Sequence, residues 1–395
     1  MTSALFVTNF CPHYHVRLFE LLGQRLDITF LFVSRGREWY WDPRHGVRTG
    51  EFKHEYLAQP RGNPALVGYR LINRLWSTRP RVIICALSGR FSLAATYLSA
   101  RIRRLPFVLW TGLWMHPQTV VHRLSFPVLR HLYRHSTAVV VYGKHVKEYL
   151  AGLNVDPARI FVAPHALDND LYDRMVDPAT LESLRVEYGL SGRSVILFVG
   201  RLTAVKGLPI LIEAASQLRD LAPVVVFVGE GEMRAELERQ AAEAGVDTRF
   251  VGYVTTGELY RFYALANVFV LPSVTVKQGR ELWGLVINEA MNQGVPVVAT
   301  DSVGAIRGGL VRHGETGLVV PEGDAVALGA ALRRIFVDNE LARRLGEAGR
   351  REVENWTTQR MADAFLEAVR FALAGRGQGA DANTLAQRSG PEQTR

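Results

Sequence analysis

The chain has 395 residues, of which 48% are hydrophobic and 22% are charged. One hydrophobic core rarely serves so long a chain, so we expect two globular domains of similar size. The two cysteines, Cys11 and Cys85, are too few for a disulfide framework or a metal cluster and indicate a reducing compartment. No apolar run reaches the ~18 residues of a membrane span and no leader pattern opens the chain, so we expect a cytoplasmic protein.

Positive charge is concentrated in the first half of the chain. Residues 1–170 hold 22 Lys and Arg against 10 Asp and Glu, whereas the remainder holds 25 against 28. Such an imbalance favours an anionic partner, which can be a phosphate group, an acidic lipid headgroup or a nucleic acid. A well-solvated basic surface accounts for the same numbers, so both interpretations stay open.

Short apolar runs alternate with helical patterns throughout. In the first half, strands are predicted for residues 4–8, 28–33, 82–86, 107–110 and 138–142, and helices for 16–26, 93–103 and 120–135. In the second half, strands are predicted for 195–199, 224–228, 249–251, 268–271, 296–300 and 317–320, and helices for 209–219, 233–244, 256–264, 285–293 and 325–336. Alternation of this kind predicts two α/β units, each a doubly wound parallel sheet with helices on both faces.

Turn-forming residues mark the division between the units. We expect a first domain over residues 1–170, a linker over 171–193 and a second domain over 194–356. An amphipathic helix over 357–374 follows. The tail from Gly375 to Arg395 has almost no apolar residues and is expected to be disordered.

Candidate ligand residues follow the predicted strands of the second unit, where open α/β sheets bind ligands. Arg201 and Lys206 in "GRLTAVKG" follow the strand at 195–199, and two cations in a glycine-bounded loop suit a diphosphate. Gly229 and Gly231 in "GEGEM" follow the next strand and would let a ligand approach the backbone.

Two glutamates flank the start of the helix after the strand at 268–271. Glu281 lies in the preceding loop and Glu289 inside the helix. We expect the helix to open with the amides of Leu282, Trp283, Gly284 and Leu285. Helix N-termini bind anions, so a diphosphate there would have Glu281 at one end, and Glu289 could accept both hydroxyls of a ribose at the other.

These stretches resemble the family 4 retaining glycosyltransferases, which have the GT-B fold. The resemblance rests on "GRLTAVKG", "VGEGEMRAELE", "RFVGYV", "LYRFYALANVFVLPS", "ELWGLVINEAMNQGVPVVATDSVGAI" and "GETGLVVP", in the family's order, over about residues 194–322. It implies two Rossmann-like domains that face a deep cleft, with the acceptor bound by the first domain and the donor by the second. It also implies that the last helix, over residues 357–374, crosses back to the first domain.

The resemblance assigns roles to single residues. Arg201 and Lys206 match the residues that bind the nucleotide diphosphate, Glu281 matches the one that contacts the donor sugar, and Glu289 matches the ribose ligand. The base is expected near the segment 250–254, at Tyr253. The family needs no cofactor beyond its nucleotide diphosphate-sugar co-substrate, most often a UDP- or GDP-sugar, and no obligatory metal.

The first domain matches the family less specifically. His116 lies where several members have an active-site histidine, so the expected catalytic set is His116, Glu281, Arg201 and Lys206; a surface loop histidine is the alternative. His13 and His15, in a loop that lines the acceptor side in the family, are weaker candidates. An insertion at Val274–Arg280 is expected to touch the sugar or the acceptor.

Several alternatives remain. The hydroxyl acceptor is either a lipid-linked glycan or polysaccharide intermediate at the inner face of the cell membrane, met through basic helices around Arg101 and Arg130, or a soluble small molecule. A dinucleotide-binding oxidoreductase is disfavoured because no G-x-G-x-x-G follows the first strand of either unit. No motif supports a nucleic acid partner. Asp168–Asp170 resembles a metal-binding Asp-x-Asp but suits a turn, and Trp39–Trp41 suits either sugar stacking or a core.

Overall fold

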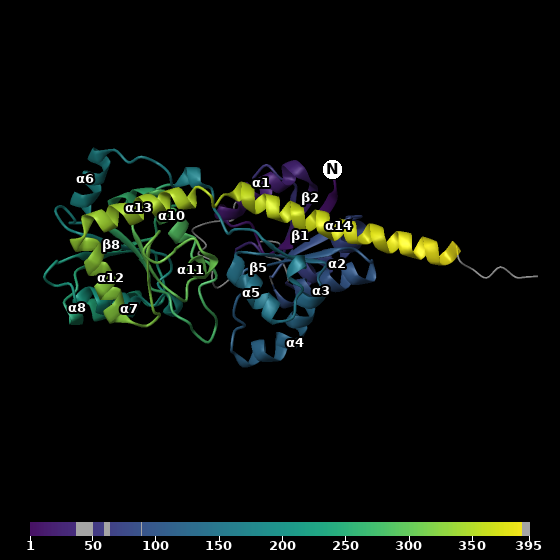
Figure 1. Cartoon of the computed structure of the whole chain (residues 1–395), viewed down its shortest axis with the longest axis horizontal. Coiled ribbons are helices and arrows are strands. Elements are labelled where there is room, and N and C mark those ends of the chain that lie inside the picture. The colour runs from purple at the N-terminus through teal and green to yellow at the C-terminus, as the bar shows by residue number, and fades with distance from the viewer. Residues whose placement is uncertain (37–49, 59–63, 88, 389–395) are drawn as a thin grey trace, which may run out of the picture.

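Two α/β units lie side by side in the computed structural model, which describes residues 1–36, 50–58, 64–87 and 89–388 (Figure 1). Trp39, Tyr40 and Trp41 fall outside these ranges. The first unit has a seven-stranded sheet in the order β3-β2-β1-β4-β5-β6-β7, and the second a six-stranded sheet in the order β10-β9-β8-β11-β12-β13. Every paired strand in both sheets is parallel. The predicted fold class, two Rossmann-like units, is confirmed.

Within its described residues, the N-terminal unit contains five α-helices besides its strands. Its strands are β1 (Ser3–Thr8), β2 (Asp27–Phe32), β3 (His54–Tyr56), β4 (Val82–Ala86), β5 (Phe107–Thr111), β6 (Ala138–Val141) and β7 (Ile160–Val162). Its helices are α1 (Val16–Arg25), α2 (Pro64–Ser77), α3 (Arg90–Ile102), α4 (Val120–His135) and α5 (Lys144–Gly152). The sequence pattern missed α2, α5 and the edge strands β3 and β7, which are short or carry polar residues.

The C-terminal unit follows the helix α6 (Pro178–Glu187), which lies within the predicted linker. Its strands are β8 (Val195–Val199), β9 (Val224–Val228), β10 (Thr248–Gly252), β11 (Val268–Leu271), β12 (Val297–Thr300) and β13 (Leu318–Val320). Its helices are α7 (Leu208–Ser216), α8 (Arg234–Ala244), α9 (Leu259–Leu265), α10 (Val286–Asn292), α11 (Gly304–Gly308), α12 (Ala325–Val337) and α13 (Asn339–Val353).

Each face of the N-terminal sheet has its own core. On one face, Phe6, Phe30 and Trp110 pack against α1 and the last helix, α14 (Thr358–Arg388). On the other face, side chains such as Val7 and Ile83 pack against α2 to α5. Parallel strands require apolar cover on both faces, which explains why the central strands read as unbroken apolar runs.

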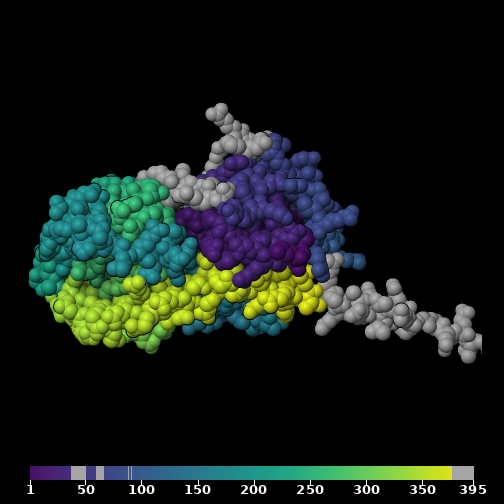
Figure 2. Space-filling view, turned by 90° about the horizontal axis from the view of Figure 1, so that it is seen from above, coloured from purple at the N-terminus to yellow at the C-terminus, as the bar shows by residue number. Residues whose placement is uncertain are grey.

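Helix α14 belongs to the N-terminal core although it ends the chain. It runs from the C-terminal unit along α1 (Figures 1 and 2). Phe365 is fully buried, with ring centroids 5.3 Å from Trp110 and 5.9 Å from Phe6. Asp363 pairs with Arg25 of α1 at 2.5 Å. The second domain therefore supplies part of the core of the first.

The end of α14 differs from the sequence prediction. The backbone is helical to Arg388, whereas the sequence predicts disorder from Gly375 onward. Helix propagation adds one hydrogen bond per residue once a nucleus exists, and the packed segment before Gly375 provides that nucleus. No proline lies within α14, and the next proline along the chain is Pro391.

We predict that Phe365→Ala destabilises the protein by about 3–5 kcal/mol, because a buried ring leaves a cavity between α14 and the sheet. Thermal unfolding followed by circular dichroism measures this loss. Phe371→Ala is the matched control, since Phe371 lies on the same helix and is 40% exposed. Equal effects of the two variants would show that α14 does not depend on the buried contact.

Candidate active site

The loops at the carboxyl edge of the second sheet bring a cation and a carboxylate together. Lys206 lies in the loop after β8 and Glu281 in the segment after β11, 75 residues apart in the chain. The Lys206 ammonium forms an ion pair with Oε2 of Glu281, and each side chain is only about 15% exposed. The Ser273 hydroxyl lies 3.5 Å from the same oxygen. Two predicted site residues thus meet in one partly shielded place.

Arg201 and Tyr253 follow neighbouring strands at this edge. Arg201 is the second residue after β8, and Tyr253 comes directly after β10. Both side chains are half-buried. Because β10, β9 and β8 are adjacent in the sheet, the loop with Arg201 and the segment with Tyr253 lie on the two sides of the loop after β9.

The glycines after β9 let neighbouring backbone pack closely. A Cβ on Gly229 would lie 2.0 Å from the carbonyl oxygen of Gly200, and one on Gly231 would lie 2.2 Å from that of Leu202. Both glycines therefore allow the loop that carries Arg201 to fit closely. The expectation that they also let a ligand approach the backbone stays a prediction.

The helix after Glu281 begins later than predicted. Leu285 is the N-cap and α10 starts at Val286. Leu282 and Trp283 precede it, so the prediction that their amides open the helix is wrong. Trp283 is 2% exposed and its indole N–H donates to Asn288 at 2.9 Å. Because the Trp283 ring is buried, the backbone at Trp283 lies outside the helix. Gly284, with φ of 89°, turns the chain, and the helix begins after it.

Glu289 lies inside the protein. The Tyr263 hydroxyl donates to its Oε2 at 2.7 Å, and the side chain is 6% exposed. Burial raises the pKa of Glu289 to about 7, and hydrogen bonds from Tyr263 and Tyr172 oppose the rise. Two tyrosine hydroxyls thus donate hydrogen bonds to the Glu289 carboxylate, as the two hydroxyls of a ribose are expected to do. A ribose ligand at Glu289 would have to displace at least the Tyr263 hydroxyl.

We predict a pH-dependent stability difference between the wild type and Glu289→Gln. The folded state holds the Glu289 proton up to about pH 7, whereas an unfolded glutamate loses it near pH 4.5. The stability from the neutral carboxyl is therefore complete below pH 4.5 and lost as the pH rises through 7, by about 3 kcal/mol.

Melting temperatures of the wild type and of Glu289→Gln at pH 5, 6, 7 and 8 give this difference. The buried histidines titrate in both proteins, so their contribution drops out when the two are compared. The melting temperature of the wild type relative to the variant should fall as the pH rises. A constant difference would mean that Glu289 is ionised throughout. Loss of all nucleotide binding in Glu289→Gln would support the role of Glu289 as the ribose ligand.

His116 is turned toward α4. Its Nε2 hydrogen-bonds the carbonyl oxygen of His122 at 2.6 Å, and its ring lies 4.6 Å from Phe126. The residue of this loop that reaches the site is Trp114, whose indole N–H donates to the Glu281 carbonyl at 3.1 Å. The geometry therefore supports a structural role for His116 and points to Trp114, which sequence reasoning missed because a lone tryptophan carries no motif.

The insertion Val274–Arg280 joins the two units. It forms a tight turn in which Val276 and Gly279 exchange backbone hydrogen bonds. The Gln118 amide donates to the Lys277 carbonyl at 2.8 Å, and the Arg280 guanidinium lies 4.9 Å from the centre of the Trp114 ring. The insertion thus contacts the loop before α4 on the N-terminal side of Glu281.

The other histidine candidates lie at the domain junction. His15 is buried, with its ring 4.9 Å from Trp110 and 5.5 Å from His165, and burial lowers its pKa. His165 stacks on Tyr142 at 3.9 Å, and burial lowers its pKa to about 3. Both rings are neutral near pH 7 and fill the junction. His13 lies at the edge of this aromatic cluster, against Tyr14.

The acidic turn of the linker is structural. The Asn169 amide donates to the carbonyl of Val353 at 3.2 Å and its oxygen accepts from Asn292 at 3.0 Å. Among residues 1–36, 50–58, 64–87 and 89–388, no three His, Cys, Asp or Glu side chains gather in a way that could hold a metal ion.

Comparison with known proteins identifies the second unit. Residues 182–352 match the model of the family described as glycosyl transferases group 1. The matched segment covers less than half of the chain and includes most of the second unit. The matched segment contains the four predicted site residues Arg201, Lys206, Glu281 and Glu289. The resemblance to glycosyltransferases that the sequence indicated is therefore confirmed.

Curated relatives match about two thirds of the chain. An alpha-D-kanosaminyltransferase of Streptomyces kanamyceticus is 31% identical over 263 residues, which are 64% of this chain and 66% of that protein. A GDP-mannose-dependent alpha-(1-6)-phosphatidylinositol monomannoside mannosyltransferase of Mycobacterium tuberculosis is 32% identical over 256 residues, 63% and 66% of the two chains. The chain thus spans slightly less than two thirds of each relative.

Solved structures match nearly the whole chain. Anabaena Alr3699/HepE in complex with UDP-glucose aligns with a TM-score of 0.73 at 19% identity, over 94% of this chain and all of that one. A glycosyltransferase from Rickettsia africae ESF-5 aligns with a TM-score of 0.74 at 18% identity, over 94% and 98%. At this identity the likeness establishes the fold, which is GT-B.

Proposed function

We propose that the protein is a retaining glycosyltransferase that moves a sugar from a nucleotide diphosphate-sugar to a hydroxyl acceptor. The contact between Lys206 and Glu281 is the observation that carries the proposal. It places a phosphate-binding cation beside a carboxylate that could accept sugar hydroxyls, at the edge of the sheet where such folds bind ligands. Membership of the group 1 family and UDP-glucose in a structural neighbour support the same donor class.

The proposed reaction breaks the bond between the anomeric carbon and the diphosphate and forms one from that carbon to the acceptor oxygen. Arg201 and Lys206 would stabilise the negative charge that develops on the leaving diphosphate. A phosphate oxygen of that group would take the acceptor proton. In this scheme the two cations supply the charge stabilisation, and we expect no obligatory metal and no further cofactor.

The acceptor is the open part of the proposal. One relative is named for phosphatidylinositol monomannoside, which is a lipid, whereas another is named only for the kanosaminyl group that it transfers. We favour a lipid-linked or polysaccharide intermediate at the inner face of the cell membrane, because of the basic first domain. No helix in the described ranges is long and apolar enough to cross a membrane.

The donor class is tested by thermal stabilisation with UDP, GDP, TDP, ADP and NAD, since a ligand that binds the folded state raises the melting temperature. One diphosphate should give a clear shift. Arg201→Ala should weaken its binding about 10–100-fold, the effect of losing one charge-assisted contact. Arg219→Ala is the control, because Arg219 is exposed at the opposite end of the sheet. Its guanidinium donates a hydrogen bond to the Ala244 carbonyl. A shift with NAD alone would contradict the proposal.

We predict that Glu281→Gln separates donor binding from transfer. The carboxylate holds the Lys206 ammonium in the structure, so its removal frees that cation for the diphosphate and should tighten nucleoside diphosphate binding. Sugar transfer should nevertheless fall, because the contact to the donor sugar is lost. Calorimetric titration and a donor-consumption assay measure the two effects. Unchanged transfer together with weaker binding would refute the role of Glu281.

A further inference from the structure

Helices α2, α3 and α4 each carry a second apolar stripe that faces solvent. On α2, Val67, Leu71 and Leu75 pack toward the sheet. A different side of the same helix exposes the large side chains Leu66, Tyr69, Ile72 and Trp76, with Tyr69 70% and Trp76 50% exposed. The spacing of these residues follows the helical period, so they form one row. A helix that is apolar on two sides has an unpartnered face.

The next two helices repeat the pattern. Helix α3 exposes Phe91, Leu98 and Ile102, and α4 exposes Val120, Val121, Leu124 and Val128, with Leu124 at 77%. These three helices hold eleven of the nineteen large apolar side chains that are exposed in the described ranges. The concentration is far beyond the scattered exposed side chains of an ordinary surface.

The three stripes belong to one surface, because all three helices cover the same face of the N-terminal sheet. A Cβ on Gly68 would lie 2.7 Å from the Phe91 ring, so α2 and α3 touch where their stripes meet. The Tyr97 hydroxyl of α3 lies 3.3 Å from His131 of α4. Figure 1 shows the three helices together on the side of the sheet away from α1 and α14.

The charge around this surface has one sign. The 92 residues from Tyr56 to Lys147 contain 14 Lys and Arg and no Asp or Glu. On α4, Arg123, Arg130 and Arg134 recur at spacings of seven and four and so form a row beside the stripe of Val120, Leu124 and Val128. The three helices themselves carry no Asp or Glu, and Glu55 of β3 pairs with Arg74 of α2 at 2.5 Å.

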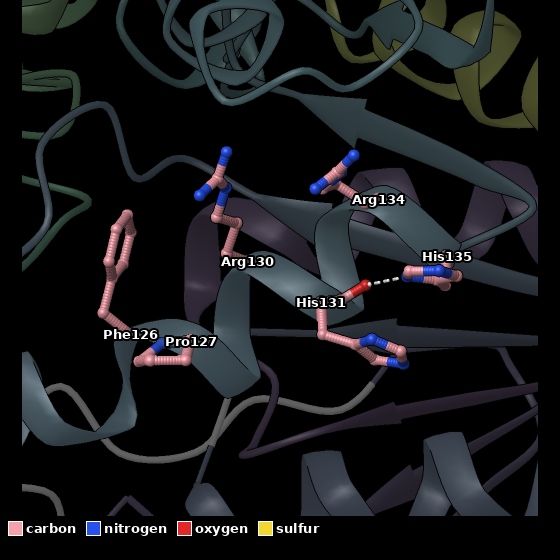
Figure 3. Close-up of a pocket in the computed structure, with 6 residues that line it drawn as sticks. All are labelled: Phe126, Pro127, Arg130, His131, Arg134 and His135. Atoms are coloured by element: carbon pink, nitrogen blue, oxygen red, sulfur yellow. Dashed lines mark hydrogen bonds between the residues drawn. The ribbon is translucent and has the colours of Figure 1, made fainter.

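A shallow hollow on α4 lies within this row. It is lined by Phe126, Pro127, Arg130, His131, Arg134 and His135. Figure 3 shows the Arg130 and Arg134 guanidinium groups pointing the same way from the helix, while His131 and His135 lie on another side. Two parallel guanidinium groups beside an apolar ring suit a phosphate group whose attached chain is apolar.

We propose that α2, α3 and α4 form a docking surface for an anionic lipid bilayer. The exposed stripes would enter the interface between headgroups and acyl chains, and the arginines would contact lipid phosphates. A second copy of this chain suits the surface poorly, because it would place uncompensated arginines opposite arginines. A nucleic acid would leave the exposed apolar rows without a partner.

The docking surface is connected to the proposed active site. The segment from Gly112 to Thr119 leads from Trp114, which contacts Glu281, directly into α4. The apolar start of α4, at Val120, Val121 and Leu124, therefore adjoins the cleft. This connection rests on the proposed function and favours an acceptor hydroxyl on a molecule held at the membrane.

The test is sedimentation of the full chain with vesicles of phosphatidylcholine alone and vesicles that also contain phosphatidylglycerol. We expect binding to the anionic vesicles only, weakened by added salt. Arg123→Glu with Arg134→Glu should weaken binding more than about fivefold for each arginine, because each basic group near an anionic surface contributes about that factor. Val128→Glu should weaken it as well by opposing entry of the apolar row.

Matched controls lie on the second domain. Val326→Glu changes a valine of α12 that is 68% exposed, close to the 60% of Val128. Arg351→Glu changes an exposed arginine of α13. Both controls should bind vesicles like the wild type. Equal loss in the control and test variants, equal binding to neutral vesicles, or binding of RNA in place of vesicles would each overturn the docking surface.

The nucleoside diphosphate shift, measured on the same samples, separates the two proposals. Vesicle binding lost in Val128→Glu with the shift intact supports docking as a function of this surface alone. No vesicle binding by a wild type that still shows the shift overturns the docking surface and leaves the glycosyltransferase standing. Vesicle binding without any diphosphate shift overturns the proposed function and leaves the surface.

Discussion

A parallel sheet must be covered on both faces, and this requirement organises the whole protein. The N-terminal sheet obtains helices α2 to α5 from its own crossovers on one face, whereas α1 is the one helix that the described part of the N-terminal unit supplies to the other face. Helix α14 completes that cover, with Met361, Phe365 and Val369 buried against the sheet. The two units are therefore tied together by the hydrophobic core of one of them.

The opposite side of the cleft is held by polar contacts. Trp114 donates to the Glu281 carbonyl, and the turn at Val274–Arg280 bonds to the loop before α4. Such contacts exchange readily with water, whereas the buried contacts of α14 do not. The geometry thus combines an apolar connection through α14 with polar contacts beside Glu281.

The candidate site depends on compensation of charge in a partly shielded place. Lys206 and Glu281 neutralise each other in the structure, so neither is left as an uncompensated charge at an exposure of about 15%. A diphosphate would replace the carboxylate as partner of the ammonium and release Glu281 for sugar hydroxyls. Among the described residues, Glu289 is buried without a cation beside it. Burial raises its pKa, and two tyrosine hydroxyls donate hydrogen bonds to it. The two glutamates of one motif thus have different partners because they differ in burial.

The sequence by itself determined the fold class and most of the strands, because unbroken apolar runs such as Val224–Val228 can only be buried parallel strands. It also located Arg201, Lys206 and Glu281, since residues that follow strands of one sheet must gather at its carboxyl edge. Only the tertiary structure decided what contacts what. Trp283 enters the core and delays α10, the Gly200 backbone fills the space beside Gly229, and His116 turns to α4 while Trp114 reaches Glu281. These outcomes depend on packing between segments far apart in the chain, which no local pattern of residues specifies.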